Sequence, residues 1–283
     1  MTNPDSLLSI RLSVDYRTKP GVLRDLTLQM RAGEILGLVG ESGCGKSTLA
    51  MGILRLLDHK RAIARGQVIF QGEDLLRKNE RELRAIRGKQ ISVVLQSPLT
   101  ALNPALRIGI QLREAWRAHA TGSRAESLQA IRGALENVCL PADDEFLSRR
   151  PSQLSVGQAQ RVIIAMGILH RPALLIADEA TSALDTITQG EILELFGQLN
   201  RQMGTAILYI SHDLMSVAAL CHRIAILRAG EIVECGTPEV IFGSPSQDYT
   251  RRLIAALPSY PQGRISDKSS SQPPKEVAVL ATS

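Results

Sequence analysis

The sequence predicts an α/β protein with a mixed sheet, an antiparallel β flank and an inserted helical subdomain. Short apolar runs that end in glycine or polar residues predict the parallel strands of the sheet, and helix-like segments follow them directly. Between about residues 97 and 168 these strand patterns fade and helical spacing replaces them, which predicts the insertion.

Three apolar runs are the predicted core strands. ILGLVG (35–40) ends in glycine and precedes TLAMGILRLL (48–57), whose apolar residues recur at helical spacing. ALLIAD (173–178) and AILYIS (206–211) end in polar residues and also lead into helical segments. Continuous apolar runs of this length are typical of strands that are buried on both faces of a parallel sheet.

Two β-rich stretches with glycine turns, 62–75 and 221–236, predict the antiparallel flank. In the insertion, IGIQLREAWRAHA, AESLQAIRGALENV and VGQAQRVIIAMGILH have helical spacing. We therefore expect one domain over 1–258, with its helical subdomain at about 97–168. The segment 259–283 is rich in Ser, Pro and Lys, and we expect it to be a disordered tail.

Composition and charge describe an ordinary globular chain. Of its 283 residues 44% are apolar and 22% charged, and the net charge of +5 comes from basic residues mixed with acidic ones, which disfavours a nucleic-acid-binding patch. No apolar run reaches the roughly 18 residues of a membrane span, and the polar start is not a signal peptide, so we expect a cytoplasmic location. The 4 cysteines form no CxxC pair, so we expect reduced thiols.

The stretch GESGCGKST matches the phosphate-binding pattern G-x-x-x-x-G-K-[ST] between a predicted strand and a predicted helix. Glycines allow backbone N–H groups to surround an anion, and the helix N-terminus adds partial positive charge. Lys46 can reach the β- and γ-phosphates of a nucleotide, and the Ser47 hydroxyl can bind Mg²⁺. A plain glycine-rich turn would not explain the Lys-Ser pair. The predicted nucleotide-binding residues, which we call the phosphate loop, are Gly40, Glu41, Ser42, Gly43, Cys44, Gly45, Lys46, Ser47 and Thr48.

Polar residues at the ends of other predicted strands complete a candidate catalytic site. Asp178 and Glu179 end a core strand, where the ligand crevice of a parallel sheet lies. Asp178 would support Mg²⁺, and Glu179 would act as general base on the attacking water. His212 would contact the edge of the γ-phosphate, and Gln96 would sense Mg²⁺ or the attacking water. A solvated strand end is the alternative for the carboxylates, and a packing or surface role is the alternative for His212.

A further motif, LSVGQAQR (154–161), follows GESGCGKST and Gln96 and precedes LLIADEATSALD and His212. With these motifs in this order, the chain resembles the ATP-binding subunit of ABC transporters over roughly residues 7–257. The resemblance implies a head-to-tail dimer with ATP and Mg²⁺ between two subunits. It implies adenine stacking on Tyr16, for which simple packing in a strand is the alternative. Two further segments are implied to act between the subunits. The signature segment, which would contact the partner's ATP, is Leu154, Ser155, Val156, Gly157 and Gln158, and the inter-site loop is Ser182, Ala183, Leu184 and Asp185.

The sequence departs from the family pattern at two positions. Val156 stands where the common signature has glycine, and because a β-branched residue disfavours positive φ, we expect ordinary dihedral angles and a side chain turned toward its own helix. Ala180 stands where proline is usual, which frees one backbone N–H. Neither change removes a group with a predicted chemical role.

Two stretches narrow the resemblance to peptide and nickel importers: LQSPLTALNPALRIGIQLREAW, and GSPSQDYTRRLIAALP at 243–258. They imply an ATPase that energises uptake of a small solute of the peptide, nickel or metal-chelate class from the cytoplasmic face of a bacterial inner membrane. The implied partners are a second ATPase subunit, either a copy or, as the resemblance favours, a related chain, together with two transmembrane permeases and an extracytoplasmic solute-binding protein. Residues 99–107 would dock on a permease.

Some alternatives remain open. Longer peptide importers carry a cysteine cluster beyond this segment, and because this chain has none, we expect no iron–sulfur site. The ATPase-type subunit of a phosphonate-degrading complex has a closely similar pattern and is a second reading. A non-transport ABC ATPase that acts on nucleic acid is a third. It is disfavoured because the chain has no coiled-coil heptads, no zinc-ligand cysteines and a single ATPase unit, so we expect no nucleic-acid partner.

Overall fold

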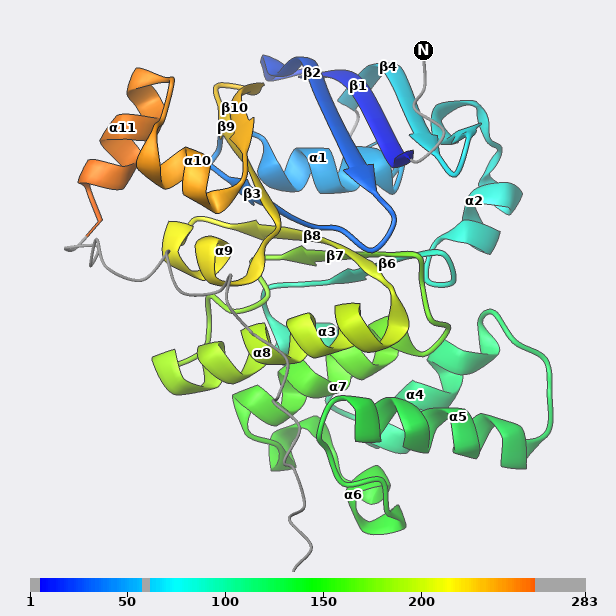
Figure 1. Cartoon of the computed structure of the whole chain (residues 1–283). Helices are drawn as coiled ribbons and strands as arrows, with labels where there is room; N and C mark the ends of the chain where they lie inside the picture. The colour runs from blue at the N-terminus through cyan, green and yellow to red at the C-terminus, as the bar shows by residue number, and fades with distance from the viewer. Residues whose placement is uncertain (1–5, 58–61, 258–283) are drawn as a thin grey trace, which may run out of the picture.

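The computed structural model describes residues 6–57 and 62–257 and confirms the α/β fold (Figure 1). Two sheets are formed by the described residues, one of four strands and one of six. The predicted disordered tail at 259–283 lies outside the described residues.

The four-stranded sheet is antiparallel and has the order β2-β1-β4-β5. Along β1 every second side chain is buried from Leu8 to Val14, which is the period expected of a strand with one face on a core. The flank predicted at 62–75 is confirmed as β4 and β5, and the N-terminal strands extend it. The strands are β1 (Ser6–Tyr16), β2 (Lys19–Arg31), β4 (Ala62–Phe70) and β5 (Glu73–Asp74).

The six-stranded sheet has the order β10-β9-β3-β8-β7-β6, and all of its neighbours are parallel except β10 and β9. The predicted core strands are confirmed as β3, β7 and β8, each almost wholly buried. Because these strands are parallel, their C-terminal ends meet at one edge of the sheet. The strands are β3 (Ile35–Val39), β6 (Ile91–Val94), β7 (Leu174–Asp178), β8 (Ala206–Ser211), β9 (Arg223–Arg228) and β10 (Glu231–Gly236).

Helix α1 (Lys46–Ile53) lies between the two sheets (Figure 1). Its buried side chains Leu49, Ala50 and Ile53 join one hydrophobic cluster with residues of both sheets. The helix therefore starts at the edge where the core strands end, and packing on both sides fixes its direction.

A second hydrophobic cluster lies on the opposite face of the six-stranded sheet, between that sheet and most of the remaining helices. The helical segments predicted at 108–120, 125–138 and 156–170 are confirmed as α4, α5 and α7. Five helices join β6 to β7: α3 (Pro98–Ala101), α4 (Ile108–Arg117), α5 (Arg124–Asn137), α6 (Asp144–Ser148) and α7 (Val156–Ile168). The others are α2 (Glu80–Ile86), α8 (Thr186–Met203), α9 (Leu214–Leu220), α10 (Pro238–Gly243) and α11 (Asp248–Ala255). None of the helices in 6–57 and 62–257 has the length and apolar character that crossing a bilayer requires.

Candidate functional site

The phosphate loop joins β3 to α1 at the C-terminal edge of the core sheet. Gly45 precedes the helix with φ 118°, a backbone conformation that a side chain would strain. Gly40 has a different reason to be glycine, since a Cβ there would lie 2.2 Å from the carbonyl oxygen of Leu227 in β9. The loop is thus held tightly against the neighbouring strand, with its N–H groups at the start of α1.

Lys46 is the positive charge at the centre of this loop. Its side chain is only 5% exposed, and its Nζ donates to the carbonyl oxygens of Gly40 at 2.7 Å and Glu41 at 3.1 Å. The loop therefore folds around its own cation. A bound phosphate would offer stronger, charged acceptors to the same ammonium group.

A cavity of about 380 Å³ opens in front of the loop. Tyr16 reaches it from β1, and its hydroxyl lies 3.3 Å from the Thr48 Oγ1. Glu179 reaches it from the end of β7. The structure thus brings together Tyr16, the phosphate loop and Glu179, which are far apart in the sequence. The lining residues are Tyr16, Thr18, Lys19, Val22, Ser42, Gly43, Gly45, Lys46, Ser47, Thr48 and Glu179.

The carboxyl group of Asp178 is buried beside this cavity. Its Oδ1 has no hydrogen-bond partner among the residues that the structure describes. Burial raises the pKa of Asp178, and the nearby Glu179 adds to this, while the Ser47 hydroxyl and the Lys46 charge lower it. A buried carboxylate oxygen without a partner, next to a serine hydroxyl, fits a hard cation such as Mg²⁺, which prefers oxygen ligands.

Glu179 has a left-handed backbone with φ 50°. Its N–H donates to the carbonyl oxygen of Ile210 at 2.9 Å, and this bond from the neighbouring strand helps to fix the turn. Its Oε1 lies 3.4 Å from Nδ1 of His212, which follows β8. The two predicted catalytic residues therefore face each other across adjacent strand ends, as their shared sheet edge requires.

The signature segment lines a different cavity, also of about 380 Å³, and this cavity shares no lining residue with the first. Ser155 caps α7, because its Oγ accepts from the N–H of Gln158 at 3.1 Å while the Gln158 Oε1 accepts from the N–H of Ser155 at 3.1 Å. Asp185 caps α8 by accepting from the N–H groups of Ile187 and Thr188. The structure thus unites two motifs that the sequence presents separately. The lining residues are Ser155, Val156, Gly157, Gln158, Arg161, Ala183, Leu184, Asp185, Thr188 and Glu191.

Two expectations about the signature segment have different outcomes. Val156 begins α7 and is not among the residues with positive φ, so the expected ordinary dihedral angles are confirmed. The expected orientation is wrong, because Val156 is 40% exposed and lines the cavity beside Ser155. The first residue of a helix has no preceding turn on which its side chain can pack, which explains the exposure.

Eight predicted residues line neither cavity: Gly40, Glu41, Cys44, Asp178, His212, Gln96, Leu154 and Ser182. Gln96 is exposed between β6 and α3 and does not line the cavity. Leu154 precedes the signature cavity, and Ser182 donates its hydroxyl to the carbonyl oxygen of Glu179 at 3.0 Å. Conversely, Thr18, Lys19 and Val22 line the first cavity without any motif having indicated them. Their only signal was their nearness to Tyr16 in the sequence.

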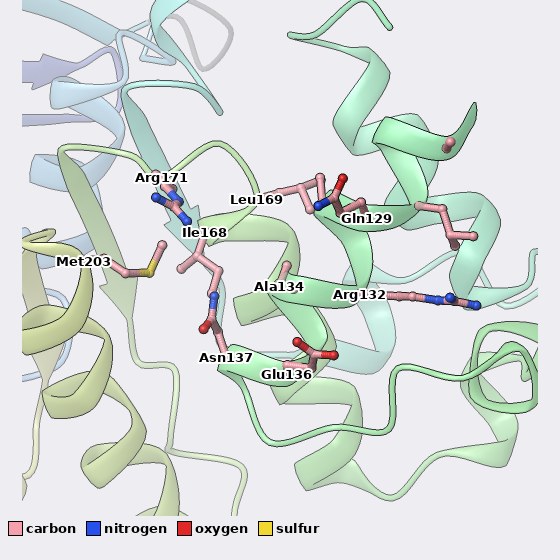
Figure 2. A pocket seen from close by; sticks show the side chains of 13 residues that line it. Gln129, Arg132, Ala134, Glu136, Asn137, Ile168, Leu169, Arg171 and Met203 are labelled. Atoms are coloured by element: carbon pink, nitrogen blue, oxygen red, sulfur yellow. The ribbon is translucent and has the colours of Figure 1, made fainter. Parts of the chain in front are cut away.

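A larger cavity of about 720 Å³ lies between α5 and the C-terminal ends of α7 and α8 (Figure 2). Side chains of Gln129, Arg132 and Glu136 lie around it on α5, and Met203 closes it from α8. It contains none of the predicted site residues. Size alone therefore does not identify the functional site, and the phosphate-loop cavity remains the candidate.

Comparisons with known proteins found similar sequences and folds. A family model described as ABC transporter matches residues 23–182. A probable peptide ABC transporter ATP-binding protein of Sinorhizobium fredii is 41% identical over 272 residues, which are 94% of this chain and 81% of the relative. The oligopeptide transport ATP-binding protein OppD of Escherichia coli is 40% identical over 90% of this chain and 76% of the relative. A solved dimeric, post-hydrolysis ATP-binding cassette bound to ADP and Pi has a TM-score of 0.70 and 26% identity, covering 82% of this chain and 98% of that one.

Proposed function

The chain belongs to the ABC transporter family as an ATP-hydrolysing subunit, and on this premise we propose that it energises the import of peptides. The arrangement of the phosphate loop, Asp178 and Glu179 around one cavity is the observation that carries the ATPase part of the proposal. The similarity to relatives described as peptide and oligopeptide transport proteins supports the cargo class.

The roles proposed for the phosphate-loop cavity follow from its geometry. The loop N–H groups and Lys46 would bind the β- and γ-phosphates of ATP, and Tyr16 would contact the adenine. Ser47 and Asp178 would hold Mg²⁺, which supplies positive charge against the phosphate oxygens when bound. Gln96, which is exposed and does not line the cavity, is proposed as a further Mg²⁺ or water contact that would move inward when nucleotide binds.

Hydrolysis requires a base for the attacking water. Glu179 lines the cavity and would accept that proton. His212, at 3.4 Å from the Glu179 carboxylate, would orient it and contact the γ-phosphate edge. The carboxylate is held by a strained backbone rather than by a flexible loop, so little reorganisation is needed at the moment of reaction.

A complete site needs two subunits in this proposal. The phosphate loop and the signature segment line separate cavities in one chain. A head-to-tail partner would bring its own signature segment to this chain's ATP, and the N-terminus of its α7 would add a helix dipole toward the γ-phosphate. The partner would be a second ATPase subunit, a copy or a related chain, and the inter-site loop would connect the two nucleotides.

Transport requires further chains. We propose two transmembrane permeases and an extracytoplasmic solute-binding protein as partners, with this subunit peripheral at the cytoplasmic face of the inner membrane. Residues 99–107 are the proposed permease contact. Nickel or a metal chelate is the second cargo candidate, because the sequence resembles importers of both kinds.

Uptake by cells that lack this chain tests the proposal. Radiolabelled tripeptide and radiolabelled nickel are supplied separately, and the deletion is complemented with the wild-type chain or with Lys46→Ala. We expect lost tripeptide uptake that the wild-type chain restores and Lys46→Ala does not. If the deletion lost nickel uptake but kept normal peptide uptake, nickel would replace peptides as the proposed cargo. Normal uptake of both, with altered phosphonate use, would favour the phosphonate-degrading complex.

A further inference from the structure

The C-terminal part of the described chain, residues 237–257, forms an arm that lies beside the phosphate loop. It consists of α10 and α11, and Figure 1 shows both helices next to β9 and β10 at the end of the sheet.

A carboxylate of β10 anchors the start of α11. The Glu234 Oε1 accepts from the Ser246 N–H at 2.7 Å and from the Ser246 hydroxyl at 2.9 Å, and its Oε2 accepts from the Gln247 N–H at 3.2 Å. Arg251 donates to the carbonyl oxygen of Pro245 at 2.8 Å. The N-terminal end of α11 is therefore tied to the sheet by several hydrogen bonds.

This anchor directs Tyr249 toward the phosphate loop. Tyr249 is 7% exposed, and its ring centre lies 4.9 Å from the guanidinium carbon of Arg228 in β9. Burial raises the pKa of the Tyr249 hydroxyl, the nearby Glu41 N–H lowers it and the nearby Glu41 carboxylate raises it. The hydroxyl has no hydrogen-bond partner within the described chain, so the ring on Arg228 is the contact that the geometry establishes.

The loop segment near Tyr249, Gly40 and Glu41, is the one that holds Lys46. The Glu41 carbonyl oxygen accepts from the Lys46 Nζ at 3.1 Å and from the Cys44 N–H at 3.3 Å. On the other side, Gly40 packs against the carbonyl oxygen of Leu227, the residue before Arg228. The end of β9 thus lies between the loop and Tyr249, with Leu227 against Gly40 and Arg228 against the Tyr249 ring.

We propose that Tyr249 is a positioning residue for nucleotide binding, which acts through the end of β9 to keep the phosphate loop in its anion-binding shape. The inference rests on the proposed ATPase role of that loop. A loop that is already ordered loses less conformational entropy when phosphate binds, so its affinity is higher. Because the loop contacts the β-phosphate in both ATP and ADP, Tyr249 should affect both nucleotides.

The test measures MgADP binding to the full chain by titration calorimetry. We expect Tyr249→Ala to weaken MgADP binding by roughly tenfold, since the loop must then be ordered on binding. In hydrolysis, KM for ATP should rise by a similar factor while kcat stays within about twofold, the pattern of lost uniform binding. Tyr249→Phe keeps the ring on Arg228 and removes only a hydroxyl without a partner in the described chain, so it should bind MgADP within about twofold of wild type.

Two controls separate positioning from stability. Ile241 is buried in α10 of the same arm and lies beside Gly236. Ile241→Ala should lower the melting temperature as Tyr249→Ala does, without the loss of affinity. Hydrogen exchange of the peptide covering 40–48 should become faster in Tyr249→Ala and stay unchanged in Ile241→Ala.

The outcomes distinguish this inference from the function on which it rests. Suppose that the wild-type chain binds MgADP, that Lys46→Ala abolishes this binding, and that Tyr249→Ala binds with unchanged affinity. This result would overturn the inference and leave the ATPase role intact. Equal losses in Tyr249→Ala and Ile241→Ala would also overturn it, because general stability would then explain both. A loss in Tyr249→Phe as large as in Tyr249→Ala would contradict the role of the ring. If the wild-type chain bound no MgADP, the proposed function and the inference would fail together.

Discussion

Glu179 combines a strained backbone with a proposed chemical role. A non-glycine residue at φ 50° costs on the order of 1–3 kcal/mol, so the surrounding contacts must hold it there. The N–H of Ser182 and its hydroxyl both donate to the Glu179 carbonyl oxygen, at 3.2 and 3.0 Å. This turn points the carboxylate into the cavity instead of along the strand. Residues held in this way are frequent at functional sites.

Replacing Glu179 by Gln should separate binding from turnover. The amide keeps the shape of the side chain but accepts no proton, so we expect ATP hydrolysis to fall by roughly 10²-fold or more while MgATP affinity stays within a fewfold. Steady-state phosphate release and equilibrium binding are the measurements. Glu194→Gln, the same change at an exposed position of α8, is the matched control. Near-normal turnover in Glu179→Gln would remove the general-base role.

Replacing Asp178 by Asn should stabilise the nucleotide-free chain. The change removes a buried charge whose Oδ1 has no partner among the described residues, a situation that costs roughly 1–3 kcal/mol. We expect the melting temperature in EDTA to rise by about 2–4 °C. In the wild-type chain, ATP should raise the melting temperature more with Mg²⁺ than with EDTA. In Asp178→Asn this difference should disappear. A lower melting temperature without nucleotide would show that Asp178 is already satisfied.

At the scale of elements, the parts that could be predicted are those with local signals. The strand ILGLVG, the glycine loop and the following helix are contiguous, and burial on both faces makes the strand uniformly apolar. Helices α4, α5 and α7 were equally visible from their spacing. His222 shows what local patterns do not reveal. Its Nδ1 accepts from the N–H of Ile35 at 3.0 Å, across 187 positions of sequence, and no motif indicates this contact.

The same reason explains the gaps in the predicted site. The position of Tyr249 on Arg228, beside the phosphate loop, depends on how α11 is anchored by Glu234, which only the folded chain determines. The union of the signature segment with the inter-site loop depends on the packing of α7 beside α8. Motifs identify which residues have chemistry to perform, whereas the fold decides which of them meet.

The junction of the helical region with the core contains a histidine pair. His119 follows α4 and His170 follows α7, with ring centres 5.3 Å apart in an edge-to-face arrangement. A Cβ on Gly88 would lie 2.7 Å from the His119 Nε2, so the turn after α2 also packs there. Burial lowers the pKa of His119, and the nearby His170 and Lys89 lower it further.

This pKa shift predicts a loss of stability in acid. Because the folded pKa of His119 lies below the ordinary value of 6.5, the unfolded chain binds the proton more strongly. Stability is therefore complete above that value and decreases as the pH falls through the folded pKa. His119→Gln should flatten the dependence of the melting temperature on pH between about 7 and 5. Identical pH profiles for the variant and the wild-type chain would contradict this explanation.

Helix α3 offers a prediction about permease contact. Leu99 is 47% exposed on α3, while Pro98 of the same helix is buried, so this short helix presents an apolar side chain outward. Leu99→Glu should leave MgATP affinity and melting temperature unchanged, because surface substitutions have little effect on stability. Copurification with membrane permeases and peptide uptake should both fall severalfold, since a charge is then placed in the interface. Val240→Glu, at an exposed apolar position of α10, should have neither effect.

For the whole molecule, the separation of the two cavities determines how sites can be assembled. The phosphate loop lies at the edge of the core sheet, and the signature segment lies at the start of α7, where it meets α8. A C2 dimer that pairs each loop with the opposite signature segment forms two equivalent composite sites. A chain that completed its own site would need these two cavities to merge.

Mixed dimers distinguish these arrangements, because the two models give opposite results. One dimer carries Lys46→Ala in one subunit and Ser155→Ala in the other; the second carries both changes in the same subunit beside an unchanged partner. All subunits also carry Glu179→Gln so that bound ATP is retained. With composite sites, the first dimer keeps one intact site and should trap about one ATP, whereas the second should trap almost none. Sites completed within one chain would reverse this order.

Ser155→Ala also removes a helix cap, which typically lowers the stability of the folded chain by about 1 kcal/mol. The control must therefore be a variant that loses a similar cap elsewhere. Ser123 caps α5 through the same reciprocal bonds, with Glu126 in place of Gln158. Dimers that carry Ser123→Ala in place of Ser155→Ala should lose as much thermal stability as the Ser155→Ala dimers. They should still trap ATP at each site whose phosphate loop is unchanged. If Ser123→Ala reduced trapping as strongly as Ser155→Ala, the effect would come from helix stability, and the role of Ser155 at the partner's nucleotide would be lost.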